Sequence, residues 1–86
     1  MYAVTFSRRA RRRFEAADAT LQRRLDRCFD QLRENPGGYP GMKALNGEYS
    51  GSFRVRVGDF RVIFDVDDTE HRVLILVIAH RSEAYT

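Results

Sequence analysis

The sequence has 86 residues, enough for a single domain spanning residues 1–86 around one hydrophobic core and too few for two. Fifteen basic residues, fourteen of them arginines, outweigh twelve acidic ones and give a net charge of +3. With one cysteine, 43% apolar residues and no long apolar run, the chain excludes internal disulfides, cysteine-based zinc sites, disorder and transmembrane helices. No signal peptide is evident, so we expect a cytoplasmic protein. The arginine excess favours an anionic partner, although a GC-rich genome, which favours arginine codons, would produce the same bias.

The first half of the sequence predicts a short strand followed by two helices. Residues 2–6 are aromatic and β-branched, which suits a strand, and Ser7 follows in a position typical of a helix N-cap. Residues 8–17 and 19–34 have helical composition and spacing, with Asp18 or Thr20 as a cap between them. Their apolar positions are out of phase, so we expect two helices packed as a hairpin. The sequence Asn35-Pro36 ends the second helix.

The second half changes from helical to alternating periodicity. After a loop at residues 36–44, residues 52–57 and 60–66 alternate as two strands around a Gly58-Asp59 turn. A polar turn at 67–71 precedes residues 73–79, a nearly continuous apolar run typical of an interior strand. The resulting order β-α-α-β-β-β predicts an α+β fold. Its helix hairpin covers one face of a mostly antiparallel sheet that ends in a three-stranded meander.

Three arginines are predicted to share the open face of this sheet. Arg54 and Arg56 alternate with apolar residues on one strand, and Arg61 occupies the next strand across the turn. Adjacent like charges cost free energy unless an anion neutralises them, so this arrangement favours a phosphate-binding face. The alternative is a solvated outer face on which Asp65 and Glu48 pair with the arginines.

Two further groups of residues are candidates for function. His80, Arg81, Glu83 and Tyr85 follow the last strand, where an imidazole titrates near neutrality and nearby arginines would lower the pKa of a tyrosine. The alternative is an ordinary chain end. The amino-terminal helix carries a basic run that either contacts RNA phosphates or an acidic protein, or forms a solvated helix face; the run is Arg8, Arg9, Arg11, Arg12 and Arg13. Cys28 lies on the apolar helix face and is expected in the core.

Three stretches resemble the RelE/ParE superfamily of toxins from type II toxin–antitoxin modules. They are Leu45-Asn46-Gly47, the arginine hairpin from Gly51 to Phe64, and the terminal sequence from His80 to Tyr85. The order of elements is also that of the family, and the resemblance covers essentially the whole chain. The hairpin and the terminal sequence are specific together, although each alone would be weak.

In its RelE branch, this resemblance implies a ribosome-dependent endoribonuclease that cleaves messenger RNA at the ribosomal A site. The RNA 2′-hydroxyl attacks the adjacent phosphate, and no metal or other cofactor is implied. The basic pair of the family maps onto Arg54 and Arg56, its next-strand arginine onto Arg61 and its terminal tyrosine onto Tyr85. A further late arginine falls at Arg81 or His80.

The resemblance also suggests roles for these residues. Arg61 would clamp the phosphate, while Arg54 and Arg56 would stabilise negative charge and contact the RNA. Tyr85 or His80 would act as the base, and Arg81 would position or stabilise the reacting group. Arg12 and Arg13 are further expected RNA contacts.

The implied partners are the ribosome, its messenger RNA and a cognate antitoxin, whose acidic segment would pair with a strand edge or lie in a groove. We expect no membrane association and no direct DNA binding by the toxin alone. A ParE-type inhibitor of DNA gyrase, which has no catalysis of its own, is an alternative with the same fold. A degenerate member that only binds its antitoxin is a third possibility.

Overall fold

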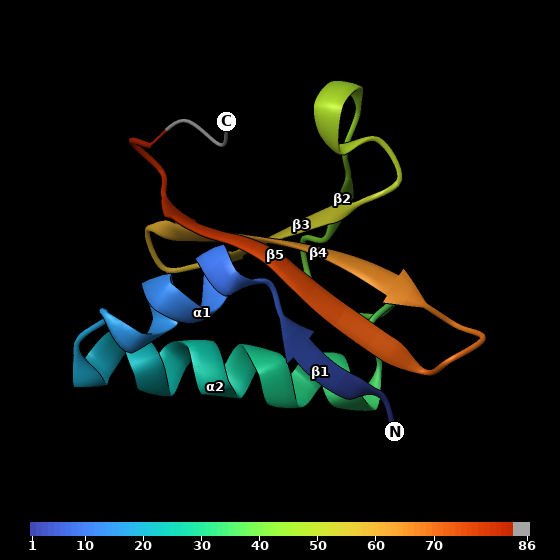
Figure 1. The fold of residues 1–86 in the computed structure, drawn as a ribbon, viewed down its shortest axis with the longest axis horizontal. Coiled ribbons are helices and arrows are strands. Elements are labelled where there is room, and N and C mark those ends of the chain that lie inside the picture. Colours follow the sequence, from blue (N-terminus) through green and yellow to red (C-terminus); the bar gives the residue numbers. More distant parts are fainter. Residues whose placement is uncertain (84–86) are drawn as a thin grey trace.

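The structure, a computed structural model, describes residues 1–83 and has two helices below one face of a single sheet (Figure 1). In chain order its elements are β1 (Ala3–Phe6), α1 (Arg8–Glu15), α2 (Ala19–Glu34), β2 (Lys43–Ala44), the 3-10 turn η1 (Gly47–Tyr49), β3 (Phe53–Val57), β4 (Phe60–Asp67) and β5 (Arg72–His80). This arrangement confirms the predicted α+β fold.

The sheet has the strand order β1-β5-β4-β3-β2, and β3, β4 and β5 form the predicted antiparallel meander. The amino-terminal strand β1 pairs parallel with β5, so that Ala3 is opposite Arg72 and Phe6 is opposite Ile75. The sheet is therefore mixed. β5 lies between β1 and β4, as its nearly continuous apolar sequence predicts.

Side-chain oxygens cap both helices at the amino end. The Ser7 hydroxyl accepts a hydrogen bond from the Ala10 amide at 3.0 Å and donates one to the Leu76 carbonyl at 2.8 Å, which ties α1 to β5. The Asp18 carboxylate accepts from the Leu21 amide at 2.8 Å and caps α2. α1 ends at Glu15, two residues before the predicted boundary of 17.

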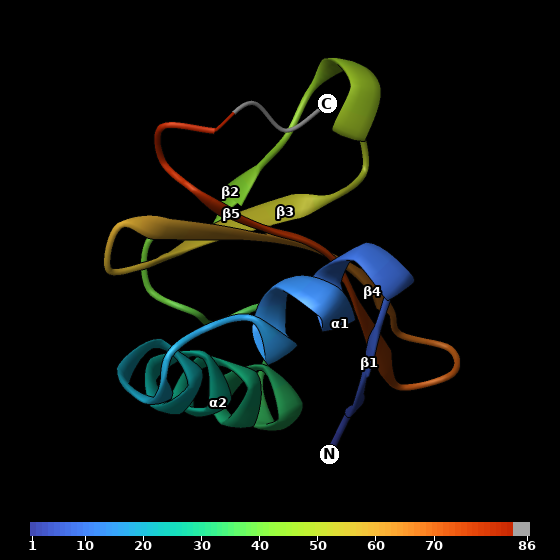
Figure 2. The same ribbon diagram turned by 60° about the vertical axis from the view of Figure 1, so that its left-hand side comes forward.

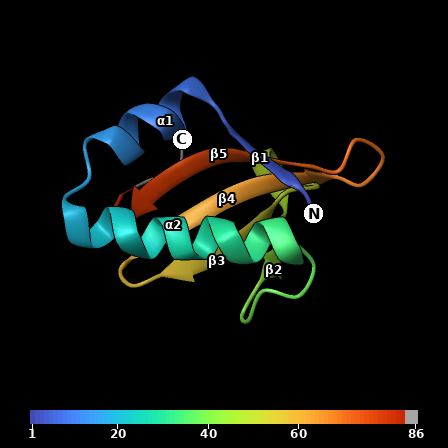
Figure 3. The same cartoon turned by 90° about the horizontal axis from the view of Figure 1, so that it is seen from below.

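The main core lies between the helices and the sheet. The apolar face of α2 predicted from helical spacing is buried there, and Cys28 is 2% exposed. Phe29 packs edge-on against Phe6 of β1 with ring centroids 5.1 Å apart, and Phe14 of α1 completes the aromatic group. Seen from below, α2 crosses the sheet while α1 lies to one side (Figure 3). Full burial of a side chain such as Phe29 stabilises the fold by roughly 1.5–3 kcal/mol.

The predicted loop at 36–44 contains a fifth strand at its end. β2 has two residues, Lys43 and Ala44, which pair with Arg54 and Phe53 of β3. Two residues are too few for periodicity to reveal. η1 follows and stands on the side of the sheet away from the helices (Figure 2). There Leu45 and Tyr49 pack against a small second cluster of buried residues, namely Ile63, Val77 and Ala79.

Candidate functional site

The three hairpin arginines lie on the open face of the sheet, as the alternation of residues predicts. Val55 and Val57 are buried toward the helices, so the intervening side chains of β3 point to the other face. Arg56 is directly opposite Arg61 on β4, and Arg54 is opposite Ile63, a residue of the open-face cluster. The alternation and register of β3 and β4 therefore direct three arginine side chains to the same face of the sheet.

A hollow of about 390 Å³ at the turn end of this face also contains a fourth arginine, which comes from the turn after β5. It is lined by Arg56, Arg61 and Arg81, together with Gly58, Asp59 and Phe60. The Arg81 amide donates to the Asp59 carbonyl at 2.8 Å, and Arg81 Nε lies 3.9 Å from Asp59 Oδ1. Three guanidinium groups and one carboxylate give the sheet hollow an excess of positive charge suited to a phosphate.

The Gly58-Asp59 turn allows Asp59 to approach Arg81 closely. Gly58 takes φ 58°, a conformation that costs glycine nothing and suits the first position of a two-residue hairpin turn. The sequence identified Asp59 only as a turn residue. Its contact with Arg81 joins two parts of the chain 22 residues apart, and no local pattern signals it.

Arg54 lies farther from the turn and does not line the sheet hollow. Its side chain is half-buried, and within residues 1–83 its Nε is a buried polar atom without a hydrogen-bond partner. Lys43 is opposite it on β2, so a second cation adjoins it. Asp65, one of the carboxylates considered as a partner for these arginines, accepts a hydrogen bond from the Ser52 hydroxyl. A buried unpaired donor beside a second cation favours an anionic ligand.

The structure places His80 apart from the arginines of the sheet hollow. Its ring meets Phe60 edge-on with centroids 5.3 Å apart, and its Nδ1 lies 2.8 Å from the Ser82 hydroxyl. His80 lines a different hollow of about 200 Å³, toward the α2 side, together with Leu21 and Arg24. His80, one of the two candidate bases, therefore does not line the sheet hollow with Arg56, Arg61 and Arg81. Tyr85, the other candidate base, lies outside the described residues.

A β-bulge explains the position of His80. The pairing of β4 with β5 shifts register between Ile63 and Phe64, which inserts one extra residue into β5. Val73 and Ile75 face the helices, but beyond the bulge Ile78 does so, while Val77 and Ala79 face the open side. Strict alternation would have placed His80 on the open face. The bulge places it on the helix side.

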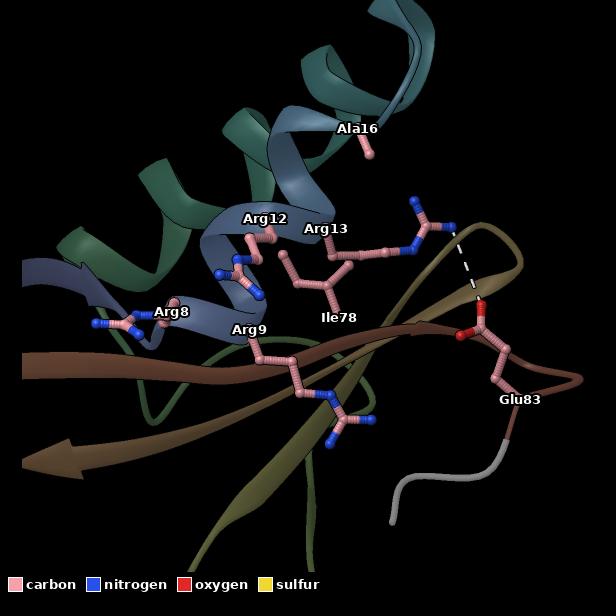
Figure 4. A pocket seen from close by; sticks show the side chains of 7 residues that line it. All are labelled: Arg8, Arg9, Arg12, Arg13, Ala16, Ile78 and Glu83. Atoms are coloured by element: carbon pink, nitrogen blue, oxygen red, sulfur yellow. Dashed lines mark ion pairs between the residues drawn. The ribbon is translucent and has the colours of Figure 1, made fainter.

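The arginines of α1 line a second hollow, of about 530 Å³, on the helix side of β5 (Figure 4). Its lining residues are Arg8, Arg9, Arg12, Arg13, Ala16, Ile78 and Glu83. The predicted RNA contacts Arg12 and Arg13 thus lie in the α1 hollow and not with the arginines of the sheet hollow. Arg13 points toward Glu83, at 4.0 Å, and its guanidinium also covers the Phe60 ring at 4.9 Å.

Among the described residues, Cys28 and Tyr39 have strongly raised pKa values, and neither lines the sheet hollow. Burial raises the pKa of the Cys28 thiol to about 11, and burial raises that of Tyr39, its hydrogen-bonding neighbour, to about 12. Both groups are therefore neutral near pH 7. Cys28 is a core residue, as the sequence predicts.

Residues 1–83, the part that the structure describes, contain neither a cluster of metal-ligating side chains nor a membrane-spanning helix. No group of three or more His, Cys, Asp or Glu side chains in this part of the chain could hold a metal ion. In the same range, no helix has the length and apolar character needed to cross a membrane.

Known proteins similar to this chain include two toxins of Mycobacterium tuberculosis (strain ATCC 25618 / H37Rv). Toxin RelG is 31% identical over 85 residues, which are 98% of this chain and 95% of that protein. Toxin RelE is 44% identical over 57 residues, which are 66% of this chain and 57% of that protein, so this match spans little more than half of that relative.

Solved structures show the same fold in toxins bound to antitoxins. One is the toxin–antitoxin complex RelBE2 of Mycobacterium tuberculosis, with a TM-score of 0.78 at 30% identity, covering 93% of this chain and 98% of that chain. Another is the archaeal RelE–RelB complex of Pyrococcus horikoshii OT3, with a TM-score of 0.81 at 25% identity, covering 96% and 98% of the two chains.

The family relationship extends over nearly the whole sequence. Residues 4–85 match the model of the family described as "ParE toxin of type II toxin-antitoxin system, parDE". Toxin RelG aligns over nearly the same length at 31% identity. With the arginine hairpin and the RelE-like sheet in place, this chain belongs to the ParE toxin family of type II toxin–antitoxin systems.

Proposed function

We propose that this chain is a ribosome-dependent messenger RNA endonuclease whose sheet hollow holds the scissile phosphate. The observation that supports it best is the meeting of Arg56, Arg61 and Arg81 around one hollow of about 390 Å³. Guanidinium groups bind phosphate oxygens in bidentate fashion and stabilise the charge that grows on them during reaction. The resemblance to RelE-type toxins supplies the reaction class.

The reaction is an internal transfer of the phosphoryl group. The RNA 2′-oxygen forms a bond to the adjacent phosphorus, and the bond from phosphorus to the 5′-oxygen breaks. A base takes the proton of the 2′-hydroxyl, and the leaving 5′-oxygen gains a proton. The products are a cyclic phosphate, which can open to a 3′ phosphate, and a free 5′-hydroxyl.

The residues divide these tasks by position. Arg61 clamps the phosphate, Arg56 and Arg81 stabilise its charge, and Arg54 contacts the RNA farther along β3. Because His80 lines the hollow toward α2, Tyr85 is the base that we propose. The α1 hollow, with Arg12 and Arg13, is the proposed second contact with RNA.

A cognate antitoxin is the proposed inhibitor. Two relatives with the same fold were solved as toxin–antitoxin complexes, which supports an equivalent partner for this chain. β2 pairs with only two residues of β3, Phe53 and Arg54, so the rest of that strand edge could accept an added strand. An acidic segment of the antitoxin would also complement the arginine-lined face.

The test is to induce this chain alone in cells and to map transcript ends. We expect cuts at A-site codons of translated messages, abolished by Arg61→Ala and suppressed by co-expressed antitoxin. Arg72→Ala is the matched control, because Arg72 is an exposed arginine at the opposite end of β5. Intact transcripts on ribosomes of arrested cells would overturn the proposal.

Gyrase inhibition is the second candidate, favoured by the name of the matching family. It predicts a DNA-damage response without transcript cleavage, and Arg61→Ala need not relieve it. Induction with no effect on growth would indicate a degenerate, antitoxin-binding member. The same experiment separates all three functions.

A further inference from the structure

The turn after β5 is fixed to two distant parts of the chain. The Arg81 amide donates to the Asp59 carbonyl at 2.8 Å, which joins the turn to the β3–β4 hairpin. Glu83 lies 4.0 Å from Arg13 of α1, which joins the turn to the other side of the sheet. Figure 4 shows Arg13 and Glu83 pointing toward each other across this gap.

Glu83 also closes the turn on itself. Its Oε1 accepts from the His80 amide at 3.0 Å, and its own amide donates to the His80 carbonyl at 2.8 Å. One carboxylate therefore makes a charge-assisted hydrogen bond to the start of the turn and an ion pair to α1. Arg81 lies between His80 and Glu83 in the sequence, so these contacts enclose it in the turn.

Arg13 has a defined position of its own. Its guanidinium lies 4.9 Å from the centre of the Phe60 ring, and Phe60 in turn meets the His80 ring edge-on at 5.3 Å. A cation over an aromatic face is held more firmly than a solvated arginine on a helix. Arg13 thus offers Glu83 a fixed partner.

From these contacts we infer that Glu83 and Arg13 are positioning residues, which hold Arg81 in the sheet hollow beside Arg56 and Arg61. The inference rests on the proposed function for its effect on catalysis, but not for the contacts themselves. An exposed ion pair alone is worth little. Its importance here is geometric, because a displacement of about 1 Å at a charge-stabilising group can cost roughly 100-fold in rate.

The first measurement is independent of activity. Hydrogen exchange of the Arg81 amide reports directly on its bond to the Asp59 carbonyl. We expect faster exchange in Glu83→Ala and Arg13→Ala. Exchange in Glu83→Gln should lie between wild type and Glu83→Ala, because the glutamine oxygen still accepts from the His80 amide while the ion pair to Arg13 is lost. Glu70→Ala is the matched control: Glu70 forms an equally long contact, 4.0 Å, with Arg72 at the opposite end of β5.

The second measurement is cleavage of RNA on ribosomes. In Glu83→Ala we expect kcat to fall roughly 10- to 100-fold with little change in KM, since binding by the other arginines persists. The kcat of the double variant Arg13→Ala/Glu83→Ala should be no lower than that of the less active single variant, because both residues act on kcat through Arg81. Loss of the proposed RNA contact of Arg13 raises KM instead. Thermal unfolding of each variant excludes global loss of structure.

The two measurements separate the inference from the proposed function. Unchanged exchange of Arg81 in Glu83→Ala, or an equal effect of Glu70→Ala, overturns the positioning role whatever the activity. A wild-type chain that cleaves no RNA overturns the proposed function, while the exchange rates still decide whether Glu83 holds Arg81.

Discussion

Arg56 and Arg61 are directly opposite each other on β3 and β4, so that two guanidinium groups share one position on the open face. Facing residues on an antiparallel pair have Cβ atoms about 5 Å apart, and like charges at that position are destabilising. The fold therefore carries a local electrostatic cost at the place where the proposed phosphate binds. Such a cost is typical of residues retained for function rather than for stability.

The first prediction follows from this pair. Arg56→Gln removes one of the two charges from an exposed position and should raise the free energy of unfolding by up to about 1 kcal/mol. The same change should weaken RNA cleavage. Denaturant unfolding and cleavage assays on one preparation measure both effects. Loss of stability together with loss of activity would mean that the pair is not in conflict.

The second prediction concerns the unpaired Nε of Arg54. Arg54→Met keeps an apolar stem and removes the buried donor, and should stabilise the free protein by about 1 kcal/mol. Inorganic pyrophosphate should raise the Tm of the wild type and raise it less in this variant, because an anion that binds only the folded state stabilises it. Arg72→Met is the control. Equal shifts of Tm in all three proteins would show that Arg54 does not contribute to binding the anion.

The third prediction tests the joint between α1 and β5. Ser7→Ala removes both the cap of α1 and the hydrogen bond to the Leu76 carbonyl, and should cost about 1–2 kcal/mol of stability. Ser50→Ala, an exposed serine after η1, should cost much less. Urea unfolding of the two variants compares them. Similar losses would show that the Ser7 hydroxyl contributes little.

The fourth prediction is a pH dependence set by Cys28. Burial raises the pKa of its thiol from 9.0 to about 11 in the folded chain, so that the unfolded chain loses this proton first as the pH rises. The stabilisation is complete below pH 9 and is lost progressively toward pH 11, by about 2 kcal/mol. Cys28→Ala should flatten this fall, although it lowers stability at every pH. Unfolding curves from pH 8 to 11 provide the comparison, and parallel curves would contradict the assignment.

Local patterns were sufficient for much of the fold. Alternation placed Arg54, Arg56 and Arg61 on the open face because the residues between them had to be buried. Helical spacing likewise identified the buried face of α2, including Cys28. In both cases one periodicity meets one apolar layer, so the side of each residue follows from counting.

Contacts between segments far apart in the sequence could not be predicted from local periodicity. The parallel pairing of β1 with β5 depends on where the chain returns after the meander, and the bulge that moves His80 to the helix side leaves no mark in an apolar strand. The same holds for the contacts of Arg81 with Asp59 and of Glu83 with Arg13. These residues are ordinary polar residues in the sequence and become informative only through their neighbours.

The pairing of β1 with β5 also bears on how the toxin is made. Ala3 is opposite Arg72, so β1 is synthesised before all the other strands described here but cannot pair until β5 is made. Contacts of such long range slow folding, because the intervening chain must be ordered first. A nascent chain that stops before Arg72 has neither a partner for β1 nor the strand that carries Arg81 into the hollow. Synthesis itself thus delays the assembly of this fold until β5 has been translated.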